Sequence, residues 1–211
     1  MELVGMLDSP YVRRVAVSLQ LMGLRFTHNN LSVFRTYPQF AAINPVVKAP
    51  SLVCEDGEVL MDSTLILDHA ESLVPIERRL MPADPRERQH ALRLIGLGLA
   101  ALEKSVQIIY ERAIRPPEMQ YAPWVDRVSK QLQAACRVLE DEVAARPFAP
   151  AAERIDQAGV TTAVTWTFLQ ALVAPLVPAA EHPALAAWAD QAEQLPAFRA
   201  APHSEATMQQ A

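Results

Sequence analysis

The chain has 211 residues, which is enough for one large domain or two small domains with buried cores. Its composition, 51% apolar and 20% charged, is that of a soluble globular protein, and a formal net charge of −5 gives no electrostatic reason to expect a nucleic-acid partner. No apolar run is long enough to span a membrane, and the first residues lack the pattern of a signal peptide. The two cysteines, Cys54 and Cys136, lie far apart and do not form a disulfide framework. We therefore expect a cytoplasmic protein without a membrane partner.

The first part of the chain predicts a strand, a helix and a second strand. Residues 2–7 form an apolar run that is typical of a buried strand. Asp8 or Ser9 can then cap a helix whose first turn accommodates Pro10. Residues 26–31 are a second strand candidate, and because no hairpin separates the two strands, we expect them to be parallel.

A hairpin is predicted next, and the Ala49-Pro50 peptide just before it is the first candidate binding group. Residues 51–54 and 58–61 are strand-like runs joined by an Asp-Gly pair, which favours a type I′ turn with positive φ at both positions. Ala49-Pro50 precedes the first of these strands. A cis peptide at this bond would leave the N–H and C=O of Ala49 unpaired, so that they could hold another peptide in extended form.

A helix is expected after the hairpin, ending near residue 73, with Leu65, Ile66 and Ala70 facing inward. Asp62-Ser63 lies at its start. The first N–H groups of a helix have no intrahelical partner, so together with the Ser63 hydroxyl they suit a carboxylate. The segment therefore predicts a peptide clamp followed by a carboxylate socket, and a small acidic peptide would fit both.

The elements define two domains. Residues 1–79 have the order β-α-β-α-β-β-α, a small α/β module, and prolines predict a linker at 80–85. From residue 86 onward the strand signals disappear, and amphipathic stretches predict an all-helical bundle over 86–202 with a loose tail at 203–211. The predicted fold class is therefore α/β followed by all-α.

Five segments together resemble the cytosolic glutathione S-transferases. They are SPYVRRV at 9–15, NPVVKAPSLV at 44–53, DSTLI at 62–66, DQAGV at 156–160 and HPALAAW…LPAF at 182–198. The resemblance runs along nearly the whole chain and is to bacterial, serine-type members. It implies a thioredoxin-like N-terminal domain, an all-α C-terminal domain and a homodimer. In the fourth segment Asp156 can cap a helix, but Gly159 replaces the family's reciprocal carboxylate, which weakens that helix start by about 0.5–1 kcal/mol.

The resemblance implies glutathione as co-substrate, no metal, and Ser9 as the catalytic residue. A free thiol with a pKa of about 8.5 is only a few per cent thiolate at pH 7, and the thiolate is the nucleophile. A hydroxyl at a helix start favours the anion by a hydrogen bond and by the helix dipole. Tyr11 could compete for this role, but the tyrosines of the family act from the end of the first strand, where this chain has Met6, Leu7 and Asp8.

The resemblance places the glutathione-binding residues at Ser9, Tyr11, Arg35, Lys48, Ala49, Pro50, Asp62 and Ser63. Asp62 and Ser63 would hold the γ-glutamyl end, while Lys48 and Arg35 are candidates for contacting carboxylates of the ligand. A solvated loop charge is the alternative for Lys48.

The second substrate would be a small apolar electrophile in contact with Tyr11 and Tyr110, although Tyr110 could instead be a core aromatic. Arg13 and Arg14 are interpreted as surface salt-bridge partners rather than catalytic groups.

The predicted function is conjugation of glutathione to small apolar electrophiles, as in detoxification. Two alternatives stay open: a non-catalytic scaffold that binds a protein partner, and a glutathione-dependent peroxidase, isomerase or dehalogenase. Thiol–disulfide exchange at the helix start is excluded because residues 9–12 contain no cysteine. The five histidines show no metal-ligand spacing.

Overall fold

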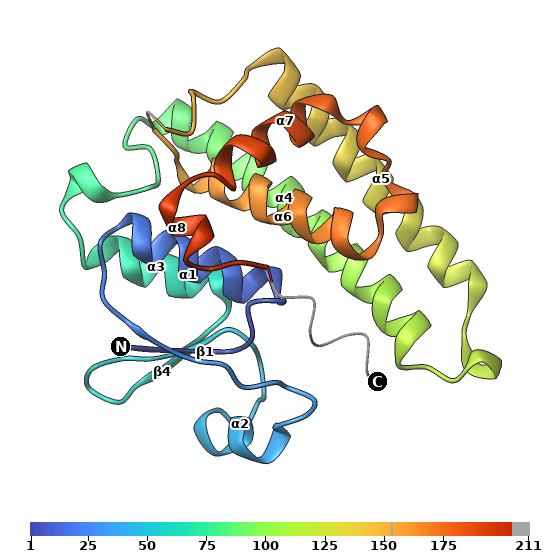
Figure 1. Cartoon of the computed structure of the whole chain (residues 1–211), viewed down its shortest axis with the longest axis horizontal. Coiled ribbons are helices and arrows are strands. Elements are labelled where there is room, and N and C mark those ends of the chain that lie inside the picture. Colours follow the sequence, from blue (N-terminus) through green and yellow to red (C-terminus); the bar gives the residue numbers. More distant parts are fainter. Residues whose placement is uncertain (153, 204–211) are drawn as a thin grey trace. The chain divides into compact units, whose positions relative to one another are not determined.

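The computed structural model describes residues 1–152 and 154–203, which divide by their packing into two compact units (Figure 1). Within the described residues, the first unit comprises Met1–Ala83 together with residues 196–203, and the second comprises Asp84–Leu195. Of the predicted tail at 203–211, only His203 lies within the described residues.

The first unit is built on a four-stranded mixed sheet with strand order β2-β1-β3-β4. Strand β1 (Glu2–Val4) pairs in parallel with β2 (Thr27–Asn29) and antiparallel with β3 (Ser51–Val53), and β3 pairs antiparallel with β4 (Val59–Met61). In the register of the two central strands, Leu3 lies opposite Leu52. The predicted parallel crossover and the predicted hairpin are therefore both confirmed.

Helices α1 (Pro10–Leu21) and α3 (Ser63–Ser72) lie on one face of this sheet, and α2 (Tyr37–Ile43) lies beyond the other face (Figure 1). The prediction that Leu65 faces inward is wrong, because Leu65 is 64% exposed while the next residue, Ile66, points into the core. The side chains at the centre of the unit have no solvent exposure: Leu3, Val15, Leu52 and Ile66.

The turn between β3 and β4 is not the predicted type I′ turn. Gly57 has a positive φ of 89°, whereas Asp56 does not have a positive φ. The N–H of Gly57 donates to the C=O of Cys54 at 3.1 Å, and the Asp56 carboxylate accepts from the N–H of Glu58 at 3.1 Å. The Asp56 side chain thus stabilises a turn in which only the glycine adopts the left-handed conformation.

The chain returns to the first unit at its C-terminal end, through α8 (Pro196–Arg199). Phe198 is completely buried, with its ring centroid 5.6 Å from the Arg13 guanidinium carbon. The Nε of Arg13 donates to the C=O of Ala201 at 2.8 Å. These residues therefore group with the first unit, although the sequence placed them in the helical domain 86–202.

The second unit is helical, and its described residues contain no strand. Helix α4 (Pro85–Ala113) packs against α5 (Ala122–Ala145) and α6 (Gln157–Leu172), and α7 (Pro183–Ala192) packs against α5 and α6. Most positions of α6 are buried, as expected for a helix at the centre of a bundle. Short 3₁₀ helices connect the elements of the two units at Ile76–Arg78, Pro117–Met119, Ala174–Leu176 and Ala179–Glu181.

Among the helices of the described residues, none is by itself both long and apolar enough to cross a membrane; α6 meets that test only together with the following segment, from which it is bent by 104°.

The start of α6 has the predicted cap, and the structure explains why the reciprocal acid is missing. The Asp156 carboxylate accepts from the N–H of Gly159 at 2.7 Å. A methyl group at Gly159 would lie 2.7 Å from Cζ2 of Trp188, and the indole N–H of Trp188 donates to the C=O of Gly159 at 2.9 Å. The indole therefore occupies the space that a side chain at position 159 would need.

Candidate functional site

The first part of the candidate site is the N-terminus of α1. Ser9 is its N-cap, with extended dihedral angles (φ −70°, ψ 120°), and its hydroxyl oxygen accepts from the N–H of Val12 at 3.4 Å. Pro10 occupies the first helical position, where its missing N–H is not needed. Ser9 is half-buried, so its hydroxyl lies at the unit's surface beside the positive end of the helix dipole.

A carboxylate and a guanidinium flank Ser9. Burial raises the pKa of Asp8 above its ordinary value, against the opposing effects of the Ser9 backbone N–H and the Arg35 charge. Nη2 of Arg35 lies 3.8 Å from the sulfur of Met6, which belongs to the loop that leads into α1. Arg35 itself is exposed, and it is placed beside the Ser9 turn rather than isolated in its own loop.

The second part of the site is the loop before β3, which Asn44 holds in shape. The buried Asn44 amide donates to the Ser51 hydroxyl at 2.9 Å, and that hydroxyl donates to the C=O of Lys48 at 2.8 Å. The Ala49–Pro50 peptide bond is cis. Within the part of the chain that the structure describes, neither the N–H nor the C=O of Ala49 makes a backbone–backbone hydrogen bond.

Gly5 brings this loop against the start of α1. Its φ is +136°, and a methyl group at this position would lie 2.6 Å from Cγ2 of Val12 and 3.2 Å from Cβ of Ala49. The close approach requires glycine both for its backbone conformation and for its lack of a side chain. Ala49 is consequently held near the helix turn that Ser9 caps.

The third part of the site is the N-terminus of α3. Asp62 caps this helix with a φ of 75°, and its carboxylate accepts from the N–H of Thr64 at 2.9 Å. Lys48 reaches the same carboxylate, with Nζ 3.7 Å from Oδ2. Val47, in the preceding loop, also has a positive φ, of 53°, which is unusual for a β-branched residue. Such strained backbone conformations are enriched at ligand sites.

Arg14 is the residue of this region that the sequence analysis missed. Its side chain is 1% exposed, and Nη1 donates to the hydroxyl of Ser63 at 3.1 Å and to that of Thr64 at 3.3 Å. Burial lowers the pKa of Arg14 to about 10, against the charge of Asp62, so the side chain still carries its proton at neutral pH. Because Arg13 is also buried, the interpretation of this pair as surface salt-bridge partners is wrong.

All but one of the predicted site residues lie in the first unit. Tyr11 lies on the first turn of α1, two residues after the cap. Tyr110 lies near the end of α4 in the second unit and is 39% exposed, which does not support the alternative that it is a core aromatic.

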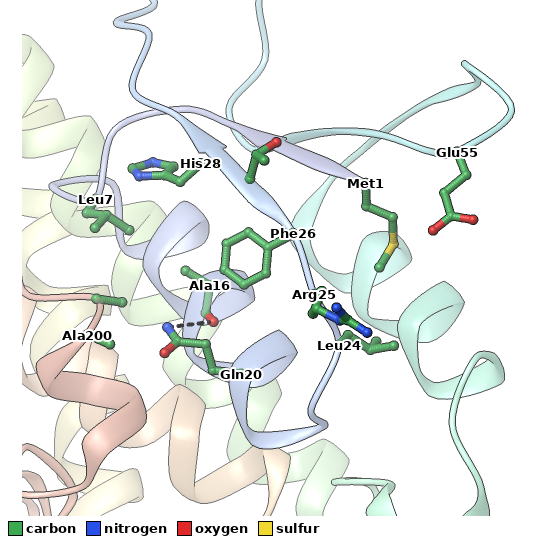
Figure 2. A pocket seen from close by; sticks show the side chains of 12 residues that line it. Met1, Leu7, Ala16, Gln20, Leu24, Arg25, Phe26, His28, Glu55 and Ala200 are labelled. Carbon is green, nitrogen blue, oxygen red and sulfur yellow. Dashed lines mark hydrogen bonds between the residues drawn. The ribbon is translucent and has the colours of Figure 1, made fainter.

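A groove of about 840 Å³ lies on a different part of the first unit (Figure 2). Two of its polar side chains already have partners: the Gln20 amide donates to the C=O of Ala16 at 3.3 Å, and Nε2 of His28 lies 2.7 Å from the C=O of Gly5. None of the predicted site residues lines it. The groove and the candidate site are therefore separate features.

Neither cysteine is an activated thiol. Burial raises the pKa of Cys136 to about 12. The pKa of Cys54 is also raised, mainly by burial and to a smaller extent by the negative charges of Asp56 and Glu58. A thiol with a raised pKa is a poor nucleophile at neutral pH. Among residues 1–152 and 154–203, no cluster of three or more His, Cys, Asp or Glu side chains is arranged to hold a metal ion.

These features have counterparts among known proteins. The family model for the glutathione S-transferase N-terminal domain matches residues 3–79. A glutathione transferase family member from Pseudomonas fluorescens Pf-5, solved with bound S-(propanoic acid)-glutathione, is 31% identical with a TM-score of 0.79, over 95% of this chain and 98% of that one. A Pf-5 structure with bound glutathione is 30% identical with a TM-score of 0.83, over 96% and 98% of the two chains.

Two curated relatives are more distant. The uncharacterized GST-like protein YibF of Escherichia coli is 29% identical over 140 residues, which are 66% of this chain and 68% of that protein. Maleylacetoacetate isomerase of Pseudomonas aeruginosa is 27% identical over 139 residues, 61% of this chain and 65% of the isomerase.

The four-stranded mixed sheet and its flanking helices thus define a thioredoxin-like domain, followed by a mostly helical remainder. The chain belongs to the glutathione S-transferase family.

Proposed function

We propose that this protein is a glutathione transferase in which Ser9 stabilises the glutathione thiolate for attack on a small apolar electrophile. The observation that carries the proposal is the position of the Ser9 hydroxyl at the N-terminus of α1, beside the loop that holds Ala49. The two Pseudomonas fluorescens structures, which contain glutathione or a glutathione thioether, support the choice of ligand.

Ser9 has the donor that this role needs. Its oxygen accepts from a backbone N–H, so the hydroxyl hydrogen is left to donate to a thiolate. Lowering the thiol pKa by about two units requires about 2.7 kcal/mol of preference for the anion. One charge-assisted hydrogen bond contributes about 1.5–3 kcal/mol, and the helix dipole adds about 0.3–1 kcal/mol. The two effects together are sufficient.

The other predicted contacts are assigned to parts of the tripeptide. The free N–H and C=O of Ala49, before Pro50, pair with the backbone of the cysteinyl residue, and Ser63 with the α3 N–H groups binds the γ-glutamyl carboxylate. Asp62 receives the α-ammonium group. Lys48, 3.7 Å from Asp62, lies within reach of the same region.

Arg35, beside the Ser9 turn, is assigned to the glycyl carboxylate. Tyr11 and Tyr110 are assigned to the electrophile. We further propose a cytoplasmic homodimer with a role in detoxification, as the family resemblance implies.

The similarity to maleylacetoacetate isomerase favours one alternative, an isomerase that uses glutathione without consuming it. Such an enzyme would need the same thiolate, so Ser9 would keep its role. Product analysis distinguishes the two functions: a transferase consumes one glutathione per turnover, whereas an isomerase returns it. A scaffold that binds only a protein partner would require neither the thiolate nor glutathione.

Calorimetric titration of glutathione, combined with ultraviolet detection of the bound thiolate, tests the proposal. Ser9→Ala should abolish the thiolate absorbance at neutral pH with little loss of affinity, whereas Ser63→Ala should weaken binding about 10-fold, the equivalent of one lost hydrogen bond to a charged group. Ser72→Ala, which removes a hydroxyl from the opposite end of α3, is the matched control and should change neither. No binding to wild type at millimolar glutathione would reject the transferase and favour the scaffold.

A further inference from the structure

Arg14 presents a buried positive charge directly beneath the start of α3. Its side chain is 1% exposed, and its two hydrogen-bond acceptors are the hydroxyls of Ser63 and Thr64, at 3.1 and 3.3 Å. Among the described residues, the Arg14 Nε has no hydrogen-bond partner, and no carboxylate is hydrogen-bonded to the guanidinium. The charge of Asp62 acts on the guanidinium without a hydrogen bond to it, so the buried cation lacks a directly paired counterion, which is unfavourable unless a partner neutralises it.

The hydrogen bonds of Arg14 determine what Ser63 can offer to a ligand. A guanidinium only donates hydrogen bonds, so the Ser63 oxygen is the acceptor and its own hydrogen remains available for a second partner. Ser63 is 3% exposed and is the first residue of α3, whose 10 residues orient the first-turn N–H groups towards the same end. A hydroxyl donor, backbone donors and a buried cation thus converge at one helix terminus.

We propose that Arg14 is a positioning residue for a ligand carboxylate at the N-terminus of α3, acting by fixing the Ser63 hydroxyl as a donor and by supplying the charge that the carboxylate neutralises. This inference rests on the proposed function, because it takes that carboxylate to be the α-carboxylate of the γ-glutamyl group. The neighbouring Asp62, paired with Lys48 at 3.7 Å, would receive the ammonium group of the same amino-acid end.

The ligand that isolates this carboxylate is 4-aminobutyryl-cysteinyl-glycine, which is glutathione without the γ-glutamyl α-carboxylate. Calorimetry should give wild type a preference for glutathione over this analogue of about 10- to 100-fold, the range expected of one or two charge-assisted hydrogen bonds. Arg14→Gln should reduce that preference about tenfold while leaving the affinity for the analogue within about twofold of wild type. In an Arg14→Gln/Ser63→Ala double variant the two losses should not add, because both remove the same interaction.

Arg13→Gln is the matched control. Arg13 is equally buried on the same helix, but its Nε donates to Ala201 rather than to the start of α3. Its replacement should lower the melting temperature and leave the preference for glutathione unchanged. The proposal is overturned if Arg14→Gln weakens glutathione and the analogue equally, or if it keeps the wild-type preference.

A titration of the wild-type protein with sodium acetate, followed by NMR, separates this proposal from the proposed function and needs no variant. Acetate should shift the Arg14 Nε–Hε signal and the Ser63 amide signal, while the Arg13 Nε–Hε signal should stay in place. If wild type fails to bind glutathione but shows these shifts, the carboxylate socket stands and its ligand is a different acid. If acetate leaves both signals unchanged up to about 100 mM, a concentration about 100-fold above a millimolar Kd, Arg14 does not serve a carboxylate and the inference is wrong.

Discussion

Gly5 occupies a position where a single methyl group should disturb both the fold and the site. A methyl group there would lie 2.6 Å from a Val12 methyl and 3.2 Å from Cβ of Ala49, and the φ of +136° disfavours any side chain. Gly5→Ala is expected to lower the free energy of unfolding by about 1–3 kcal/mol through overpacking and backbone strain. It should also weaken glutathione binding, because Ala49 must move. Urea denaturation and calorimetry measure the two effects.

Gly57→Ala is the control for this prediction. Gly57 also has a positive φ, of +89°, but no atom lies within 4 Å of the added methyl group. It should therefore lose stability from strain alone and keep its affinity for glutathione. An equal loss of affinity in both variants would show that the contact between Gly5 and Ala49 is not what positions the loop.

Residue type alone predicted the helix caps but not the buried arginines. Ser9, Asp62 and Asp156 cap helices as their short polar side chains indicate, since each needs only a backbone N–H two or three residues away. The Arg14 contact with Ser63 joins residues 49 positions apart, and charged residues are mostly exposed, so a surface position was the expected one. The overlooked signal is that the other residues of α1 are mostly apolar, apart from Tyr11, Ser18 and Gln20, which leaves little exposed surface for an arginine.

At the level of the helices, the start of α6 should depend on pH through Asp156. Burial raises the pKa of this carboxyl above 3.8, its ordinary value, so the folded protein binds the proton more tightly than the unfolded chain. The protonated Asp156 carboxyl therefore contributes its full stabilisation below pH 3.8, and this stabilisation is lost as the pH rises through the raised pKa of the folded state. Asp156→Asn keeps a capping side chain but does not titrate.

Urea denaturation of wild type and Asp156→Asn across this pH range tests the prediction. As the pH rises from below 3.8, the free energy of unfolding of wild type should fall relative to that of Asp156→Asn, and the difference between the two proteins should then level off. Asp156→Ala loses the cap and should be less stable than the asparagine variant by about 1 kcal/mol at every pH. A difference that shifts towards wild type with rising pH would mean that the carboxylate, not the acid, is favoured by folding.

The order of the elements follows from local patterns, whereas their finer geometry depends on specific contacts. Alternating and helical periodicities gave the parallel crossover, the hairpin and the helices, because periodicity reflects which side chains face a core. The turn type was mispredicted because the Asp56 side chain accepts from Glu58 and stabilises a turn with only one positive φ. Asp-Gly is compatible with both turns, so the pair alone cannot distinguish them.

In the whole molecule, the path of the chain at its C-terminal end was the least predictable feature. The Arg13 side chain and the Ala201 C=O that accepts its hydrogen bond are 188 positions apart, and no local pattern reports such a contact. The sequence analysis placed residues 196–202 in the helical domain 86–202 because they follow the bundle in the chain. Burial of Phe198 beside Arg13 assigns the end of this segment to the first unit instead.

This assignment predicts which part of the protein responds when Phe198 is truncated. Phe198→Ala removes a completely buried ring that lies over the Arg13 guanidinium, and such truncations lower stability by about 3–5 kcal/mol. Hydrogen exchange should show lost protection in β1 and α1 of the first unit, because α1 carries Arg13. Phe168→Ala, at an equally buried ring of α6, should instead reduce protection within the second unit. If Phe198→Ala instead loses protection only in α4–α7, the segment around Phe198 belongs to the helical domain and the assignment to the first unit is wrong.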